Sequence, residues 1–315
     1  MKRFSEIIGQ NPVKETLDLL VRGHKNGAHI PALLLIAPMG SGKTMLAEEF
    51  GRYLTTDGKN PRPYSCISSA SLKSKTDLTL LWQNKVEDQE CTILFDECHG
   101  IAEEVSEILL NLLNPNDTHK NSVDVYLKGE RYPLSSDFSK QTFIFATTDP
   151  QKLTLPFIDR LERIDLQNYT HFELSRIINK NLIKFNIKAS NDALCEVSKV
   201  LRGNARAAQK MASKINLFMT AYQIKSFDSE CWGKMKKKYN ILPMGMSPLE
   251  LRVLRALSKK DRTLQGLSSI LTLAKSMVQR DVESFLTVHD LMEIDGKRKI
   301  TKEGKKYLEK LDSTT

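Results

Sequence analysis

Residues 33–44 read Leu-Leu-Leu-Ile-Ala-Pro-Met-Gly-Ser-Gly-Lys-Thr. An apolar run enters a glycine-rich turn that ends in Gly42-Lys43-Thr44, and a helical pattern follows over 44–55. A strand, a glycine-rich loop and a helix in this order are typical of a phosphate-binding P-loop. The N–H groups of such a loop and of the first helical turn bind polyphosphate. We therefore expect nucleotide contacts from Pro38, Met39, Gly40, Ser41, Gly42, Lys43 and Thr44.

Length and composition indicate a globular chain of more than one domain. The chain has 315 residues, of which 40% are hydrophobic and 27% are charged, and no apolar run is long enough to cross a membrane. Its five cysteines lack C-x-x-C spacing, which argues against structural zinc and fits the reducing cytoplasm. The net charge of +9 favours a polyanionic partner such as nucleic acid, with a solvated basic surface as the alternative.

Three segments differ in their periodicity. Residues 1–165 alternate short apolar runs (32–36, 92–95, 142–146) with helical patterns (11–24, 44–55, 102–113), which predicts an α/β domain with a parallel sheet covered on both faces. Residues 166–241 have helical periodicity at 171–184, 190–201 and 204–222 and no convincing strand. They predict a small helical domain, and we interpret its lysine-rich end, 234–238, as a linker. Residues 242–315 form the third predicted domain.

The third segment has the pattern of a winged helix. The stretch Ser247-Pro248-Leu249-Glu250 is a capping box with proline at the first helical position. Further helices are predicted over 263–271 and 274–287, and two short strands flank the turn at Asp295-Gly296. Within the last of these helices we expect five residues to be buried: Met277, Val278, Val282, Phe285 and Leu286.

In a winged helix that binds DNA, the third helix enters the major groove and the wing lies along the backbone. The exposed polar residues expected there are Lys275, Gln279 and Arg280 on the helix, with Lys297, Arg298 and Lys299 on the wing. Their positive charge favours nucleic acid as the partner. A winged helix used for protein contacts is the alternative.

Polar residues at the ends of the other predicted strands complete the nucleotide chemistry. Asp96 and Glu97 follow the run Thr92-Ile93-Leu94-Phe95, and buried acids need a partner. Beside a P-loop, Asp96 and Thr44 would hold Mg²⁺, and Glu97 would act as general base on the attacking water, while Lys43 reaches the β- and γ-phosphates. A hydroxyl at Thr147-Thr148 can sense the γ-phosphate. Arg160 and Arg206 are the candidate arginines, with surface ion pairs as the alternative for both.

With these landmarks, the chain resembles the AAA+ ATPases, and more narrowly the RuvB family of Holliday-junction branch-migration motors. Residues 4–10 match the family's adenine-side motif, 37–44 its Walker A and 93–99 its Walker B motif. The resemblance implies that Ile7 and Ile8 line the base, that Thr148 is sensor 1, that Arg160 is the arginine finger and that Arg206 is sensor 2. It further implies ATP and Mg²⁺ as cofactors, a helical lid at 166–241, a winged helix at 242–315 and a homo-oligomer, expected to be a hexameric ring.

A hairpin and four departures refine this resemblance. Residues 123–134 suggest two strands around Lys128-Gly129, which in RuvB-like proteins dock on the partner RuvA, although an ordinary hairpin is the alternative. Ala37 replaces the first Walker glycine, Ala205 a proline and Ile158 an arginine. Residues 147–153 resemble bacterial clamp-loader subunits instead. The sequence therefore predicts an ATP-dependent motor on branched DNA, with a loader or initiator-like switch as the alternative.

Overall fold

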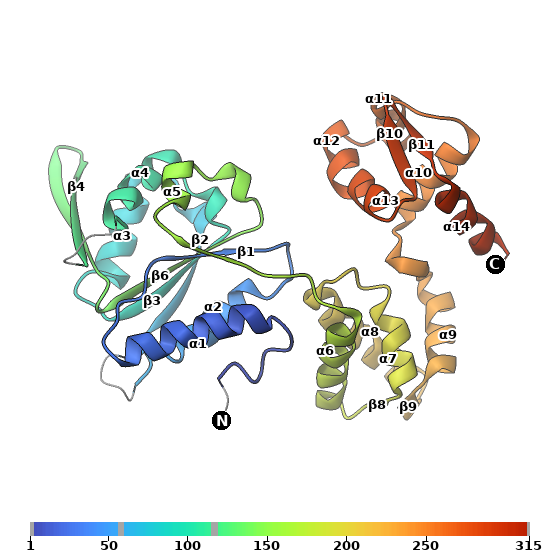
Figure 1. Ribbon diagram of the computed structural model, residues 1–315, viewed down its shortest axis with the longest axis horizontal. Helices are drawn as coiled ribbons and strands as arrows, with labels where there is room; N and C mark the ends of the chain where they lie inside the picture. The colour runs from blue at the N-terminus through green and yellow to red at the C-terminus, as the bar shows by residue number, and fades with distance from the viewer. Residues whose placement is uncertain (1–2, 56–59, 115–118, 314–315) are drawn as a thin grey trace. The chain divides into compact units, whose positions relative to one another are not determined.

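The computed structural model describes residues 3–55, 60–114 and 119–313, and its chain divides into two compact units, Met1–Phe227 and Asp228–Thr315. The first unit contains a five-stranded parallel sheet in the order β2-β3-β6-β1-β7 (Figure 1). Its strands are β1 (Leu33–Ile36), β2 (Tyr64–Ser68), β3 (Cys91–Asp96), β6 (Gln141–Thr147) and β7 (Glu162–Asp165). The predicted parallel sheet is confirmed.

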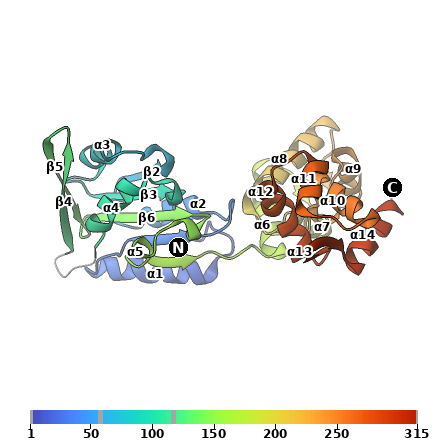
Figure 2. The same ribbon diagram turned by 90° about the horizontal axis from the view of Figure 1, so that it is seen from above.

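Alternate residues of the central strands face two separate cores. Leu34, Ile93 and Phe143 pack with helices on one face, whereas Leu33, Leu94 and Ile144 pack on the other, as the period of two in a strand requires. Figure 2 shows the resulting layers. One face is covered by α1 (Asn11–Lys25) and α2 (Lys43–Gly51), and the other by α3 (Lys75–Lys85), α4 (Glu103–Leu112) and α5 (Leu155–Ile158). Short 3₁₀ turns lie at Ser69–Ser71 (η1), Cys98–Gly100 (η2) and Pro150–Lys152 (η3).

The predicted hairpin is present as an antiparallel pair, β4 (Lys120–Leu127) and β5 (Glu130–Asp137), beyond the edge of the layered domain in both views (Figures 1 and 2). Val125 and Leu134 pack in the core on the sheet face that α3, α4 and α5 cover. Ser136 donates to the carbonyl of Leu112 at 2.6 Å, and the indole of Trp82 donates to the carbonyl of Ser135. One end of the hairpin is therefore anchored on α3 and α4, while Tyr126 stays 63% exposed.

The helical segment of the first unit follows β7. It contains α6 (His171–Lys184), α7 (Asn191–Ser198), α8 (Ala205–Ala221) and a two-residue parallel pair, β8 (Lys188–Ala189) with β9 (Ser226–Phe227). Each helix begins at a side-chain cap, which is a capping box at Thr170 with Glu173 for α6, Ser190 for α7 and Asn204 for α8. The three expected helices are confirmed, and the β8–β9 pair is a small feature that the sequence did not reveal.

The second unit has the order of a winged helix. After α9 (Ser229–Tyr239) and the turn η4 (Pro243–Gly245) come α10 (Pro248–Lys259), α11 (Leu264–Leu271), α12 (Lys275–Val278), α13 (Ser284–Val288), β10 (Met292–Asp295), β11 (Lys297–Ile300) and α14 (Lys302–Asp312). The capping box at Ser247 and Glu250 and the antiparallel β10–β11 wing are as predicted. The linker interpretation of 234–238 was wrong, because these lysines lie within α9.

The helix expected over 274–287 is not uniform. A π-helical turn at Gln279–Glu283 (η5) separates α12 from α13. Val278, Val282 and Leu286 are buried as expected and Phe285 is half-buried, but Met277 is 40% exposed. The burial expected for Met277 was therefore wrong. A single π turn adds a residue to the helical repeat, and such turns often occur at functional sites.

Candidate nucleotide site

The P-loop joins β1 to α2 and has the backbone that its glycines allow. Gly40 and Gly42 have φ values of +80° and +94°, which side chains rarely adopt. Lys43 is buried, and its Nζ donates to the carbonyl of Ala37 at 2.9 Å. Burial lowers the pKa of Lys43, while the carboxylates of Glu97 and Asp96 act in the opposite direction. The amino group of Lys43 is thus held at the loop, close to the carboxylates of Asp96 and Glu97.

Asp96 and Thr44 are placed to share a cation. Asp96 ends β3, and Thr44 Oγ1 donates to its Oδ2 at 3.4 Å. Neighbouring ligands of octahedral Mg²⁺, each about 2.1 Å from the metal, lie about 3 Å apart. The two oxygens therefore fit adjacent positions around one Mg²⁺, and both residues line the same cavity.

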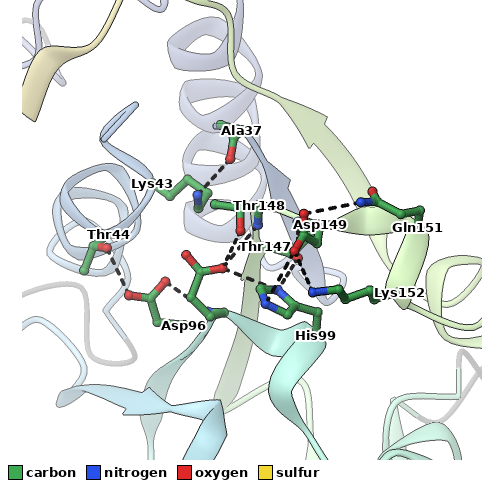
Figure 3. A network of polar contacts seen from close by, with 11 residues as sticks. Ala37, Lys43, Thr44, Asp96, His99, Thr147, Thr148, Asp149, Gln151 and Lys152 are labelled. Atoms are coloured by element: carbon green, nitrogen blue, oxygen red, sulfur yellow. Dashed lines mark hydrogen bonds and ion pairs between the residues drawn. The ribbon is translucent and has the colours of Figure 1, made fainter. Parts of the chain in front are cut away.

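Glu97 follows Asp96 in a left-handed backbone conformation, with φ 52° and ψ 53°. A residue other than glycine is strained there, and such strain is often found at active sites. Its Oε2 accepts hydrogen bonds from Thr148, from Oγ1 at 2.9 Å and from the backbone N–H at 3.3 Å. Figure 3 shows His99 next to the same carboxylate, with Nδ1 3.4 Å from Oε2. The structure therefore brings the predicted base and the predicted sensor into direct contact.

A cavity of about 470 Å³ adjoins the P-loop and the side chains of Asp96 and Glu97. Its walls come from the P-loop, the acids and α6 and α8 of the helical segment. Ile8 lines it, whereas Ile7 is 3% exposed and lies in the core of the sheet face covered by α1 and α2. The expectation that Ile7 lines the base is therefore not supported. Near Ile8, Lys180 of α6 donates to the backbone carbonyl of Glu6 at 2.7 Å and lowers the pKa of the Glu6 carboxyl.

The two candidate arginines lie in different places. Arg206, in the first turn of α8, lines the cavity. Arg160 follows α5, is absent from the cavity wall as far as the described residues define it, and donates from Nη1 to the carbonyl of Pro156 at 2.8 Å. Its buried Nε has no hydrogen-bond partner among the described residues. Of these two arginines, Arg206 is therefore the one that lines the cavity beside the P-loop.

Three consecutive P-loop carbonyls accept hydrogen bonds from the start of α8 and from Tyr169, which lies between β7 and α6. Asn204 Nδ2 donates to Met39 at 3.0 Å, the N–H of Arg206 to Gly40 at 3.2 Å and Tyr169 Oη to Ser41 at 3.1 Å. A Cβ on Gly40 would lie 2.3 Å from Asn204 Oδ1. The sequence analysis did not identify Asn204, Tyr169, Lys180 or His99 as parts of this site, because their contacts join segments that are distant in the chain.

The predicted DNA-contacting residues of the second unit fall into two groups. Lys275, Gln279, Arg280 and Lys297 are exposed, with Arg280 paired to Asp281, and Lys299 pairs with Asp295. Arg298 is different, because its side chain is only 11% exposed and makes a two-point ion pair with buried Glu283, at 2.7 and 3.1 Å. Arg298 is therefore committed to the protein interior, and its expected phosphate contact is not supported.

Comparison with known proteins agrees with this site. Residues 33–169 match the family model "ATPase family associated with various cellular activities (AAA)". With the P-loop, the paired acids and Arg206 around one cavity, residues 33–169 form the nucleotide-binding domain of an AAA ATPase.

Its similarity to RuvB extends over nearly the whole chain. The chain is 25% identical over 317 residues to the "Holliday junction branch migration complex subunit RuvB" of Mycoplasmopsis pulmonis, covering 98% of this chain and 97% of the relative. For the same subunit of Campylobacter fetus the identity is 26%, with 94% and 84% covered. The solved structure of the RuvB motor of Thermotoga maritima has a TM-score of 0.77 at 20% identity, covering 98% and 97%. The protein is a RuvB-like AAA+ ATPase.

Proposed function

We propose that this protein is an ATP-driven DNA motor of the RuvB type, which moves the branch point of a Holliday junction. One observation carries the proposal. A single chain combines a cavity lined by the P-loop, Asp96, Glu97 and Arg206 with a winged helix that exposes Lys275, Arg280 and Lys297. Relatives matched over nearly the full length are named as branch-migration subunits, which supports the same activity here.

In the proposed reaction, ATP binds in the cavity with its phosphates on the P-loop. Bound Mg²⁺, held by Thr44 and Asp96, would neutralise charge that develops on the phosphate oxygens. Lys43 contacts the β- and γ-phosphates. Glu97 accepts a proton from the attacking water. Thr148 contacts the γ-phosphate, and Arg206 of the same subunit also contacts the γ-phosphate.

The proposed active form is a homo-oligomer, expected to be a hexameric ring. Arg160 does not line its own cavity, so we propose that it completes the site of a neighbouring subunit. An arginine supplied in this way contributes about 10³–10⁵ in rate, which would make hydrolysis depend on assembly. Movement of the helical lid during the ATP cycle then pulls DNA held by the winged helix. A cytoplasmic location, expected from the cysteines, is part of the proposal.

We propose further that the β4–β5 hairpin docks a RuvA-type junction-binding partner. Tyr126 is exposed on this hairpin, whose other end is fixed to α3 and α4 by the contacts of Ser135 and Ser136. Tyrosine is enriched in protein–protein interfaces, which supports this hairpin as a docking element.

Branch migration of a synthetic four-way junction, measured with and without a RuvA-type partner, tests the function. We expect ATP-dependent conversion of the junction to products, absent from Lys43→Ala and from Glu97→Gln proteins. DNA-stimulated ATPase without any junction conversion would contradict the motor. That outcome would favour the second candidate, a loader or initiator-like switch, which the clamp-loader-like residues 147–153 support.

A further inference from the structure

The carboxylate of Glu97 is held from one side only. The contacts found for it within the described residues, from Thr148 Oγ1, Thr148 N–H and His99 Nδ1, all involve Oε2. The Glu97 side chain is 45% exposed and lines the cavity. This arrangement fixes one oxygen of the carboxylate and leaves Oε1 available to the cavity, where the attacking water would lie.

His99 is itself fixed by groups from another strand end. Its Nδ1 lies 2.9 Å from Thr147 Oγ1, and its Nε2 lies 3.9 Å from Asp149 Oδ2. Thr147 Oγ1 also accepts the N–H of Asp149 at 3.0 Å, and Lys152 pairs with Asp149 at 2.8 Å. The imidazole is 19% exposed, so it is clamped between η2 and the end of β6 (Figure 3).

The neighbours of the imidazole select its tautomer. A carboxylate oxygen 3.4 Å from Nδ1 repels a lone pair on that nitrogen and attracts an N–H. Neutral histidine carries a proton on only one nitrogen. Glu97 Oε2 lies 3.4 Å from Nδ1, whereas Asp149 Oδ2 lies 3.9 Å from Nε2, so the form with N–H on Nδ1 is the better fit. His99 then donates toward both Glu97 Oε2 and Thr147 Oγ1.

We propose that His99 is a positioning residue for the general base Glu97, an inference that rests on the proposed ATPase mechanism. The Glu97 side chain is 45% exposed and has three rotatable bonds, so it needs contacts from neighbouring groups to keep one orientation. Thr148 supplies part of that support in this structure, but as the γ-phosphate sensor it must turn to the nucleotide during the reaction. His99 remains on Oε2 at that stage and keeps Oε1 directed at the water.

Substitutions that retain one of the two ring positions test this role. Asparagine places its amide donor near the Nδ1 position, and glutamine places its donor near the Nε2 position. We expect His99→Gln to lower kcat by about 10- to 100-fold, less than the 10²–10⁴ attributed to a general base itself. The Kd for ATP should change by less than about twofold, because His99 is not among the described residues that line the cavity. His99→Asn should recover most of kcat.

Asp149→Asn is the matched control, because it changes only the Nε2 side of the ring. Because Asp149 helps to hold the imidazole but has no contact with Glu97 among the described residues, kcat should fall less in Asp149→Asn than in His99→Gln. Equal losses in His99→Asn and His99→Gln, or full activity in both, would overturn the proposal. Thermal unfolding and ATP binding of each variant separate this result from misfolding. An inactive wild-type protein would contradict the ATPase mechanism itself, which is a different outcome from an active enzyme indifferent to residue 99.

Discussion

At the scale of single residues, Ala37 is the departure from the P-loop pattern that most invites a functional explanation. Its side chain is 3% exposed and belongs to the core between the sheet, α1 and α2. Its N–H donates to the carbonyl of Thr147 at 3.3 Å, and its own carbonyl receives Lys43. Among the described residues, the positive φ values of this loop belong to Gly40 and Gly42. The alanine methyl therefore contributes to packing and causes no backbone strain.

The variant Ala37→Gly should consequently lose stability without gaining activity. Removing a buried methyl group and adding backbone freedom should lower the free energy of unfolding by about 1 kcal/mol. Chemical denaturation measures this change, and steady-state ATPase at a temperature where both proteins are folded measures activity. A several-fold faster ATPase in the variant would show instead that Ala37 restrains the loop.

At the scale of elements, the ion pair between Glu283 and Arg298 joins the π-helical turn to the wing. Glu283 and Arg298 side chains are 6% and 11% exposed. Arg298 also exchanges two backbone hydrogen bonds with Arg262, at 2.7 and 3.1 Å. The wing is thus tied to the helix that precedes it and to the chain before α11. Exposed Lys297 is left as the wing cation best placed for phosphate.

Two variants should separate these roles in DNA binding. Lys297→Ala should reduce the slope of log affinity against log salt by about one unit, with unchanged stability. Arg298→Met should leave that slope unchanged but destabilise the second unit by about 3–5 kcal/mol, because it leaves a buried carboxylate unpaired. Thermal unfolding and DNA titrations over several salt concentrations measure both effects. Adding Glu283→Leu to Arg298→Met should restore stability, and a reduced slope in Arg298→Met would contradict the assignment.

The strands of the parallel sheet show how far the sequence could predict this fold. The inner strands β1, β3 and β6 are almost entirely buried and were recognised from continuous apolar runs. The edge strands β2 and β7 were missed, because each is half-exposed and carries polar residues. The P-loop and its acids follow local patterns. Partnerships between distant segments, such as Glu283 with Arg298 or Asn204 with Met39, depend on tertiary packing that no local pattern records.

At the scale of the whole molecule, the position of Arg160 makes a prediction about assembly. Subunits with Lys43→Ala lack a working P-loop but keep their arginine, and subunits with Arg160→Ala have the opposite defect. Mixing the two inactive proteins should restore part of the ATPase activity, because some interfaces then combine an intact P-loop with an intact arginine. ATPase measured across mixing ratios should pass through a maximum. ATPase activity that never exceeds the weighted sum of the two separate proteins, at any mixing ratio, would contradict an arginine acting between subunits.

The hydrogen bonds to Met39, Gly40 and Ser41 have a mechanical consequence. A peptide unit directs its carbonyl and its N–H in opposite directions, so a loop gripped by its carbonyls presents its N–H groups to the phosphates. Asn204 and Arg206 hold the carbonyls of Met39 and Gly40 from the start of α8, and the same helix end carries the Arg206 side chain into the cavity. The P-loop and α8 are therefore joined by two hydrogen bonds, from Asn204 to Met39 and from Arg206 to Gly40. A nucleotide bound to this loop would therefore be in contact, through the loop and through Arg206, with the start of a helix of 17 residues.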